Sequence, residues 1–163
     1  MDVTAHTPSP AAGPPNADET VRQLNSLLRG EIAAAETYRM AIDKVSATEQ
    51  AANAGLLREI QEEHGRAAQG LRDRIQELGG EASDSSGAWG VWAKTVQGTM
   101  NLLGDAASLK ALKEGEEHGL KDYNEALDDV DPNSAQLIQN QLIPAQQRHI
   151  NLLDQLITSV GKA

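Results

Sequence analysis

The feature that most constrains this chain is an internal repeat with a period of 85 residues. Residues 21–75 align without a gap on residues 106–160 and are identical at 12 of the 55 positions. Several of these identities are apolar, and any two amphipathic helices can share such positions. The polar identities are more telling, because the only two tyrosines of the chain, Tyr38 and Tyr123, fall at equivalent positions. Duplication of one structural unit is the simplest explanation.

The first repeat predicts a pair of helices. Apolar residues recur at steps of three and four over residues 18–45, and the same spacing continues from a short turn at residues 46–48 to residue 78. Gly79-Gly80 is typical of a helix C-terminus. Because the turn between the two helices is short, they must form an antiparallel hairpin.

The second repeat predicts an equivalent hairpin. Its first helix is expected to begin near Asp105, and Asp131-Pro132 then predicts an N-cap and the first turn of a helix that ends near Val160. The link between the hairpins is long and includes an expected short helix over residues 89–103. The sequence therefore predicts an all-α antiparallel four-helix bundle with one long crossover, which is the connectivity of ferritin-like bundles.

Composition supports this fold class and narrows the function. The chain of 163 residues has no Phe and no Cys, so thiolate metal sites and disulfides are excluded. Its net charge of −10 argues against a nucleic-acid partner, which needs a basic surface. No apolar run is long enough to span a membrane, and the N-terminus does not resemble a secretory signal. We therefore expect a cytoplasmic protein without membrane contact, while self-association into a homo-oligomer stays open.

The domain boundary is expected near residue 18. Residues 1–17 contain four prolines and almost nothing that a core would bury, which predicts a disordered tail. His6 lies in this tail and is not expected to have a function. Residues 18–163 are predicted to form the single bundle domain.

Polar residues interrupt the apolar stripe of every predicted helix at a matching depth. Burying an unpaired carboxylate costs several kcal/mol, so such groups must pair with one another or with a metal ion. Carboxylates and imidazoles brought together from four helices are typical of metal sites in bundle cores. The predicted metal ligands are Glu31, His64, Glu116 and His149, and the predicted residues around them are Tyr38, Gln61, Tyr123 and Gln146.

These residues resemble a motif of known proteins. Glu31 with Tyr38, and Glu116 with Tyr123, are similar to the E-x6-Y pattern of bacterioferritins and rubrerythrins, and the resemblance covers roughly residues 20–160. It is closest to a small bacterial ferritin-like family. The resemblance implies a site for two iron or manganese ions that reacts with dioxygen or peroxide, and a role in metal or oxidative stress. Any enzymatic activity would then be that of an oxidoreductase.

The sequence departs from this motif at two positions. The second and fourth helices of the ferritin-like pattern carry E-x-x-H, whereas here Gln61 precedes His64 and Gln146 precedes His149. A dinuclear site sets four carboxylates against two divalent ions, but only Glu31 and Glu116 are present. Two further positive charges would have no counter-charge in the core. One divalent ion, iron or manganese, fits these residues better than two.

A hypothesis without metal stays open beside the metal site. Gln and His side chains can satisfy the two carboxylates in a buried hydrogen-bond network, and the bundle would then be an interaction or structural module. His118 and the acidic residues Glu59, Glu62 and Glu63 are expected on solvated surfaces, from which the acidic residues can attract cations. Pro144 is expected to kink the last helix.

Overall fold

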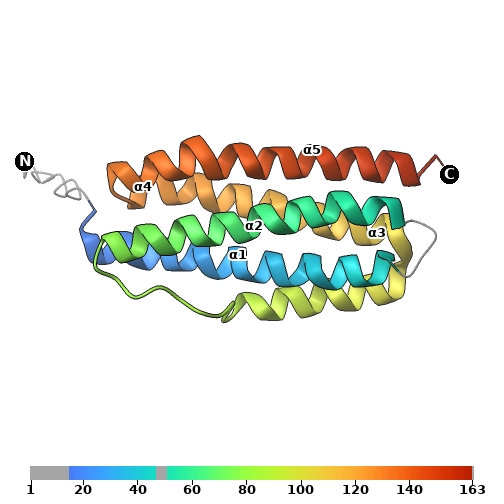
Figure 1. The fold of residues 1–163 in the computed structure, drawn as a ribbon, viewed down its shortest axis with the longest axis horizontal. Helices are drawn as coiled ribbons and strands as arrows, with labels where there is room; N and C mark the ends of the chain where they lie inside the picture. The colour runs from blue at the N-terminus through green and yellow to red at the C-terminus, as the bar shows by residue number, and fades with distance from the viewer. Residues whose placement is uncertain (1–14, 47–50, 163) are drawn as a thin grey trace, which may run out of the picture.

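The computed structural model describes residues 15–46 and 51–162, and it describes their side chains except at positions 45–46, 51–52, 89 and 91–105. Four helical rods lie side by side, as predicted, and no strand occurs in these described ranges (Figure 1). The rods are α1 (Ala17–Ser46), α2 (Ala51–Glu77), the later part of α3 (Trp89–Ala126) and a composite fourth rod. The fourth rod consists of α4 (Pro132–Leu137), the π-helical segment η2 (Ile138–Leu142) and α5 (Ile143–Val160), and a single 3-10 turn, η1 (Leu127–Asp129), precedes it.

Long-range contacts define the direction of each rod. Tyr38 of α1 bonds Glu116 of α3, whereas Glu31, two turns earlier on α1, bonds the later residue Tyr123, so α1 and α3 are antiparallel. His64 of α2 bonds Glu116 of α3, and the later residue Arg74 bonds Asp131, which follows the end of α3, so α2 and α3 run in parallel. A parallel pair requires a long connection between its members. The predicted crossover topology is therefore confirmed.

The crossover lies along the outer side of α1. Asn25 donates to the carbonyl of Glu81 at 2.8 Å and accepts from the backbone of Ser83 at 2.7 Å. Further along, Ser86 donates to Glu36 at 3.2 Å. The expected helix over residues 89–103 is present as the first part of α3, which begins at Trp89 and continues to Ala126. Figure 1 shows this part below α1, and the chain turns back at the right-hand end of the bundle into the later part of α3. Residues 1–14 of the predicted tail and most of the turn at 46–48 lie outside the described residues.

Specific residues end and start the helices as the sequence indicates. Gly79 has a positive φ of 76° and its N–H bonds the carbonyl of Gln76, while the N–H of Gly80 bonds Ile75. These two bonds form a Schellman motif at the end of α2. A side chain at position 80 would also collide with Val21, since a Cβ there would lie 2.7 Å from its methyl groups.

Pro144 does not break the fourth rod. The chain widens into the π-helical segment η2 immediately before it, and the N–H of Ile143 bonds the carbonyl of Ile138, five residues back. Proline has no N–H and its ring clashes with a carbonyl one α-helical turn earlier, so a π turn relieves the conflict locally. The helix therefore continues to Gln146 and His149 without a break, and the π turn changes only the direction in which the later side chains point around the helix axis.

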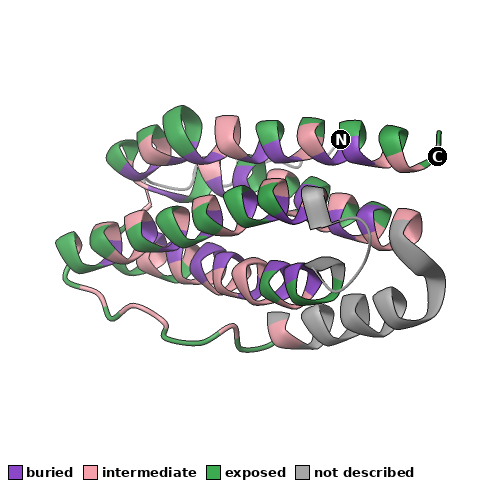
Figure 2. Cartoon of the chain, turned by 45° about the vertical axis from the view of Figure 1, so that its right-hand side comes forward, coloured by how far each residue is buried: buried purple, intermediate pink, exposed green. Residues whose placement is uncertain are grey.

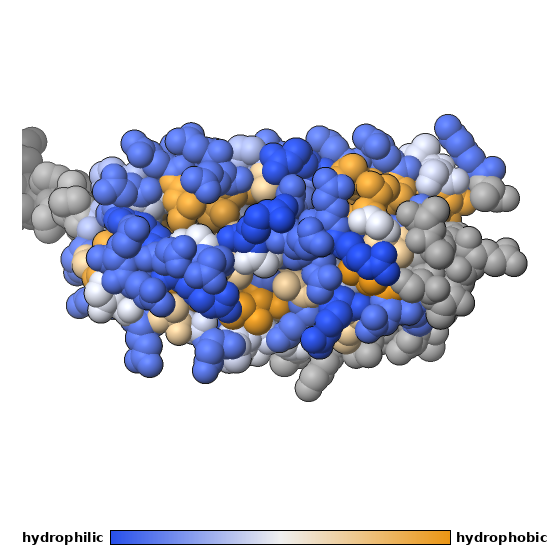
Figure 3. All heavy atoms as spheres, viewed as in Figure 1, coloured by the Kyte–Doolittle hydropathy of each residue, from blue (hydrophilic) through white to orange (hydrophobic). Residues whose placement is uncertain are grey.

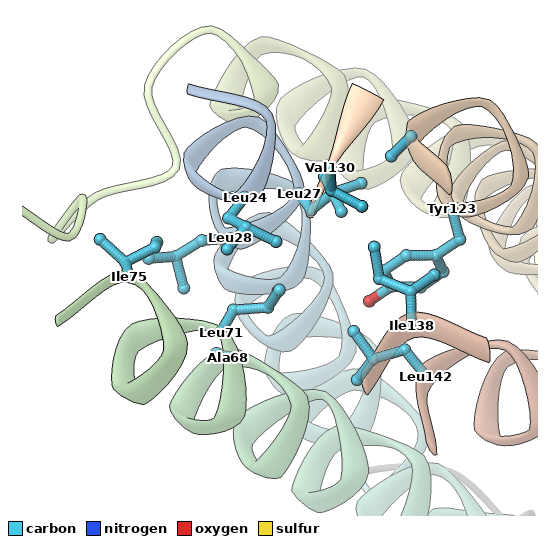
Figure 4. Close-up of a cluster of buried hydrophobic side chains, with 11 residues drawn as sticks. Leu24, Leu27, Leu28, Ala68, Leu71, Ile75, Tyr123, Val130, Ile138 and Leu142 are labelled. Atoms are coloured by element: carbon cyan, nitrogen blue, oxygen red, sulfur yellow. The ribbon is translucent and has the colours of Figure 1, made fainter. Parts of the chain in front are cut away.

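Figure 2 shows buried residues along the inner faces of the helices. Their apolar side chains form two clusters, one toward each end of the bundle. One cluster contains Leu24, Leu71, Ile75 and Ile138. Tyr123 also belongs to it, and Figure 4 shows its hydroxyl oxygen in red. The other contains Leu57, Leu112 and Leu153. On every rod, the predicted metal ligand (Glu31, His64, Glu116 or His149) lies in sequence between the two clusters.

The outer surface is predominantly hydrophilic, with separate apolar areas between rods on the face drawn in Figure 3. Within the described part of the chain, no helix combines the length and the apolar character needed to cross a membrane.

A network at one end of the bundle generates the first prediction. Asp131 caps α4 by accepting from the backbone of Asn133 and Ser134, and it also bonds Arg74 of α2 at 2.9 Å. We expect Asp131→Ala to lower the free energy of unfolding at neutral pH by about 1–2 kcal/mol, as loss of an N-cap usually does. Urea denaturation measures this effect, with Asp129→Ala at an exposed position as the control.

The effect of Asp131 should also depend on pH. Partial burial alone would raise the pKa of Asp131, but its bonds from Ser134 and Asn133 and the charge of Arg74 lower it below the ordinary value. A lowered pKa stabilises the fold above the ordinary value near 3.8, and this contribution is lost as the pH falls below it. Equal unfolding free energies of Asp131→Ala and wild type at pH 7 would contradict this account.

Candidate metal centre

Each rod contributes one predicted ligand to the middle of the bundle. Glu31 of α1, His64 of α2, Glu116 of α3 and His149 of α5 are all buried, with at most 5 % of their surface exposed. Each lies on the apolar stripe of its helix, so the packing that forms the core also brings the four side chains together. The predicted convergence is therefore present in the structure.

His64 links the two carboxylates. Its Nδ1 lies 2.7 Å from Oε2 of Glu31, and its Nε2 lies 2.9 Å from Oε1 of Glu116. Burial alone would lower the pKa of His64, but the charges of Glu116 and Glu31 and the bonds to them raise it to about 10. Without a metal ion, His64 is thus an imidazolium at neutral pH and donates both of its N–H groups.

Glu116 is the carboxylate with the most partners. Burial alone would raise its pKa, but the charge of His64 and the bonds from His149 and His64 lower it to about 2. Gln146 donates to its Oε2 at 2.6 Å and to its backbone carbonyl at 3.0 Å. Glu116 is therefore an anion that nitrogen donors from two other rods surround.

Each of the two tyrosines bonds a glutamate of the other repeat. Tyr38 donates to Oε1 of Glu116 at 2.5 Å, and Tyr123 donates to Oε1 of Glu31. Burial, followed by the charge of the bonded glutamate, raises the pKa of both hydroxyls well above the ordinary value. Both tyrosines are therefore neutral donors, and each holds the glutamate of the other repeat.

The two glutamines differ although their positions are equivalent. Gln146 is buried in the cluster, whereas Gln61 is half-buried between α1 and α2 and its Nε2 points to the carbonyl of Ala35 at 3.4 Å. The expected placement of Gln61 beside the site is thus not observed. The neighbouring residue explains the difference: a Cβ at Gly119 would lie 2.7 Å from Nε2 of Gln146, and the repeat-equivalent residue, Ala34, carries such a Cβ.

Glu63 is a residue of the site that the sequence-based prediction placed on a solvated surface. Its side chain is only 18 % exposed, and its Oε2 lies 2.7 Å from Nε2 of His149. Partial burial alone would raise the pKa of Glu63, but the bond and charge of His149 and the charge of Arg148 lower it. Glu63 is therefore an anion that accepts the Nε2–H of His149.

A pattern in the sequence indicates Glu63 in retrospect. Its repeat-equivalent residue is Arg148, and the two lie 3.3 Å apart. Equivalent residues that touch must lie close to the axis relating the repeats, and so must His64 and His149, whose rings are 4.8 Å apart. Opposite charges immediately before the two histidines were the available signal. Glu62 and His118 are exposed, as predicted.

The donor atoms of three residues are close enough for one ion. His64, Glu116 and His149 offer ligand atoms within 4.8 Å of one another, and Nδ1 of His149 lies 3.3 Å from Oε2 of Glu116. Two ligands at about 2.1 Å from one ion and at a right or tetrahedral angle are separated by roughly 3.0–3.4 Å. The His149 Nδ1–Glu116 Oε2 pair has this separation, and the three residues could hold one metal ion if the longer separations, up to 4.8 Å, shorten. The carboxylates that bridge a pair of ions in the ferritin-like motif are absent at positions 61 and 146.

The protonation states of the cluster give a pH prediction for the metal-free protein. The raised pKa of His64 stabilises the fold fully below about pH 6.5, and this contribution is lost as the pH rises toward 10. The lowered pKa of Glu116 stabilises the fold above about pH 4.5, and this contribution is lost toward pH 2. Both contributions are present between about pH 4.5 and 6.5, so we expect the free energy of unfolding to be largest in this range. Urea denaturation in the presence of a chelator measures it.

A variant isolates the alkaline part of this profile. His64→Gln cannot carry the charge, so its unfolding free energy should depend less on pH between 6.5 and 10 than that of wild type. Parallel profiles of the two proteins over this range would show that His64 is not the titrating group.

Comparison with known proteins identifies the family. Residues 19–129 match the sequence profile described as a domain of unknown function, DUF2383. The match includes Glu31, His64 and Glu116 but ends before His149. A search of curated proteins and a search of solved structures gave no match. Because the matched segment covers more than half of the chain, the protein belongs to the DUF2383 family.

Proposed function

We propose that this protein binds one divalent transition-metal ion, iron or manganese, in the core of its helical bundle. The observation that carries the proposal is the convergence of His64, Glu116 and His149, three buried residues whose ligand atoms lie within 4.8 Å of one another. Two imidazoles and one carboxylate are a ligand set that suits divalent iron and related ions.

The partners of the two histidines support this assignment. Nε2 of His64 and Nδ1 of His149 both face Glu116, while their other ring nitrogens face Glu31 and Glu63. Metal-binding histidines usually donate their second N–H to a carboxylate, which fixes the tautomer and orients the ring. Glu31, expected from the sequence to be a direct ligand, thus occupies the position of an outer partner of His64.

The charges favour one ion rather than two. Glu31, Glu63 and Glu116 bring three negative charges, and the exposed Arg148 and Arg66 beside Glu63 offset its charge. One divalent ion bound by neutral histidines balances the remaining two. A second ion would leave two positive charges uncompensated in a poorly solvated interior.

The ferritin-like resemblance of the sequence extends the proposal. The E-x6-Y pattern and the crossover topology fit a ferritin-like bundle, in which iron and manganese are the usual ions. With such an ion, the protein would take part in the response to metal or oxidative stress. Any catalysis at the site would be oxidation–reduction at the metal.

A metal-free network is the second candidate, and a specific observation favours it. Every buried side-chain nitrogen and oxygen in the described part of the chain has a hydrogen-bond partner without any ion. The imidazolium of His64 supplies the positive charge between Glu31 and Glu116. In that case the cluster stabilises a bundle that acts through contacts with other proteins.

The deciding experiment compares metal binding in matched variants. Protein purified without chelators is analysed for bound metals, and the metal-free form is titrated calorimetrically with Mn(II), or with Fe(II) in the absence of oxygen. We expect one ion per chain, with affinity reduced at least tenfold, about the lower limit for loss of a site residue, in Glu116→Gln. Glu62→Gln removes the same charge at an exposed position and should bind like wild type. No binding by wild type would favour the metal-free network.

The two glutamines offer a second matched pair. Gln146→Glu places a carboxylate where the amide lies 2.6 Å from Glu116, so we expect metal affinity to rise at least about tenfold. The metal-free form should lose about 1–3 kcal/mol of stability, because the amide donor is replaced by a second anion. Gln61→Glu alters the equivalent position outside the cluster and should change neither property much. Equal effects of both substitutions would contradict the asymmetric site.

A further inference from the structure

A narrow cavity between α1 and α3 reaches the candidate metal centre. Its volume is about 50 Å³, and the buried side chains of Glu31, His64 and Glu116 line it. His118 and Asp122 line the same cavity, and their side chains are 51 % and 27 % exposed. The cavity therefore connects the surface of the bundle to both core carboxylates.

Small residues keep this path open. Gly30 and Gly115 are repeat-equivalent, as are Ala34 and Gly119, and all four line the cavity. The two helices thus face each other across the axis of the repeat without a large side chain at these positions. A Cβ at Gly30 would have no atom within 4 Å, so the space beside it is unfilled.

The outer part of the cavity carries groups that bind cations. His118 and Asp122 lie one helical turn apart on α3, with Nε2 of His118 3.6 Å from Oδ2 of Asp122. An imidazole and a carboxylate on one helix face are ligand types that divalent transition metals accept. Glu31 and Glu116 lie further in, so ligand groups follow one another along the path.

Among the described residues, a second route lies on the opposite side of the bundle; it is wider, at about 270 Å³, but it is less favourable for a cation. A groove between α2 and α5 meets the cluster at His149, but Nε2 of His149 is bonded to Glu63. Glu63 also faces two cations, Arg148 at 3.3 Å and Arg66 at 3.8 Å. An approaching metal ion would meet two positive charges and a donor atom that is already occupied.

We propose that the metal ion reaches the core through the cavity between α1 and α3, with His118 and Asp122 as its first protein ligands. This inference rests on the proposed metal-binding function. The cavity holds only a few waters, since its volume is about 50 Å³ and roughly 10–15 Å³ of such volume accommodates one water. The ion must therefore shed most of its hydration shell on the way, and the side chains along the path replace the lost water ligands.

Rates of metal uptake and release test the path. Co(II) is the probe, because its visible absorption changes when protein nitrogen and oxygen replace water. Gly30→Leu places a side chain in the cavity, and Gly55→Leu is the control at an exposed position of α2 that also has open space around its Cβ. A blocked path slows passage in both directions, so uptake and chelator-driven release should each be at least about tenfold slower in Gly30→Leu only.

A second variant tests the outer ligands without filling the cavity. Asp122→Asn removes one charge from a partly exposed side chain, and Co(II) uptake should again slow while circular dichroism shows an intact bundle. Uptake at the wild-type rate in both Gly30→Leu and Asp122→Asn would overturn the path, and so would faster release from Gly30→Leu, which indicates a damaged site. A wild-type protein that shows no Co(II) spectrum would instead overturn the proposed metal-binding function.

Discussion

Burying two carboxylates in the middle of a helical bundle costs several kcal/mol for each unless a positive charge accompanies them. In this protein His64 supplies that charge, with one ring nitrogen on Glu31 and the other on Glu116. The requirement constrains the whole fold, because the three groups come from three different helices. A shift of any helix by one turn, about 5.4 Å, would leave a buried charge without its partner. The polar cluster thus fixes the register of the bundle, which the apolar clusters on either side define only loosely.

The repeat and the apolar spacing were sufficient to predict the helices, their pairing and the burial of Glu31, His64, Glu116 and His149. They could not predict which residues at the edges of each apolar stripe turn inward. Gln61 and Gln146 have the same place on their helices. Gly119 leaves room for the amide of Gln146, whereas the repeat-equivalent residue on the other hairpin, Ala34, has a Cβ. Such steric effects depend on contacts between helices, which a periodicity within one helix does not contain.

Some contacts of the site follow the twofold repeat of the sequence and others do not. The tyrosine–glutamate pairs obey the repeat, since each tyrosine bonds the glutamate of the other hairpin. The histidines do not: His64 bonds both core carboxylates, whereas His149 bonds Glu116 and Glu63. Two residues at equivalent positions near an axis face each other, so identical charges there would repel. Glu63 and Arg148 avoid this repulsion by being opposite in charge, and their difference also gives the site two unlike sides.

The same donor atoms serve the two candidate states of the core. In the metal-free state, a proton on Nε2 of His64 lies between that nitrogen and Glu116. In the metal-bound state, an ion would take the place of that proton, because a nitrogen that binds a metal must be deprotonated. Tyr38 and Gln146 can keep their bonds to Glu116 in both states, and Glu31 can still accept from Nδ1 of His64. The surrounding network therefore needs little rearrangement when a proton is exchanged for a metal ion. A hydrogen-bonded core that is complete without metal is thus compatible with metal binding, because it would hold the candidate ligands in place for an ion.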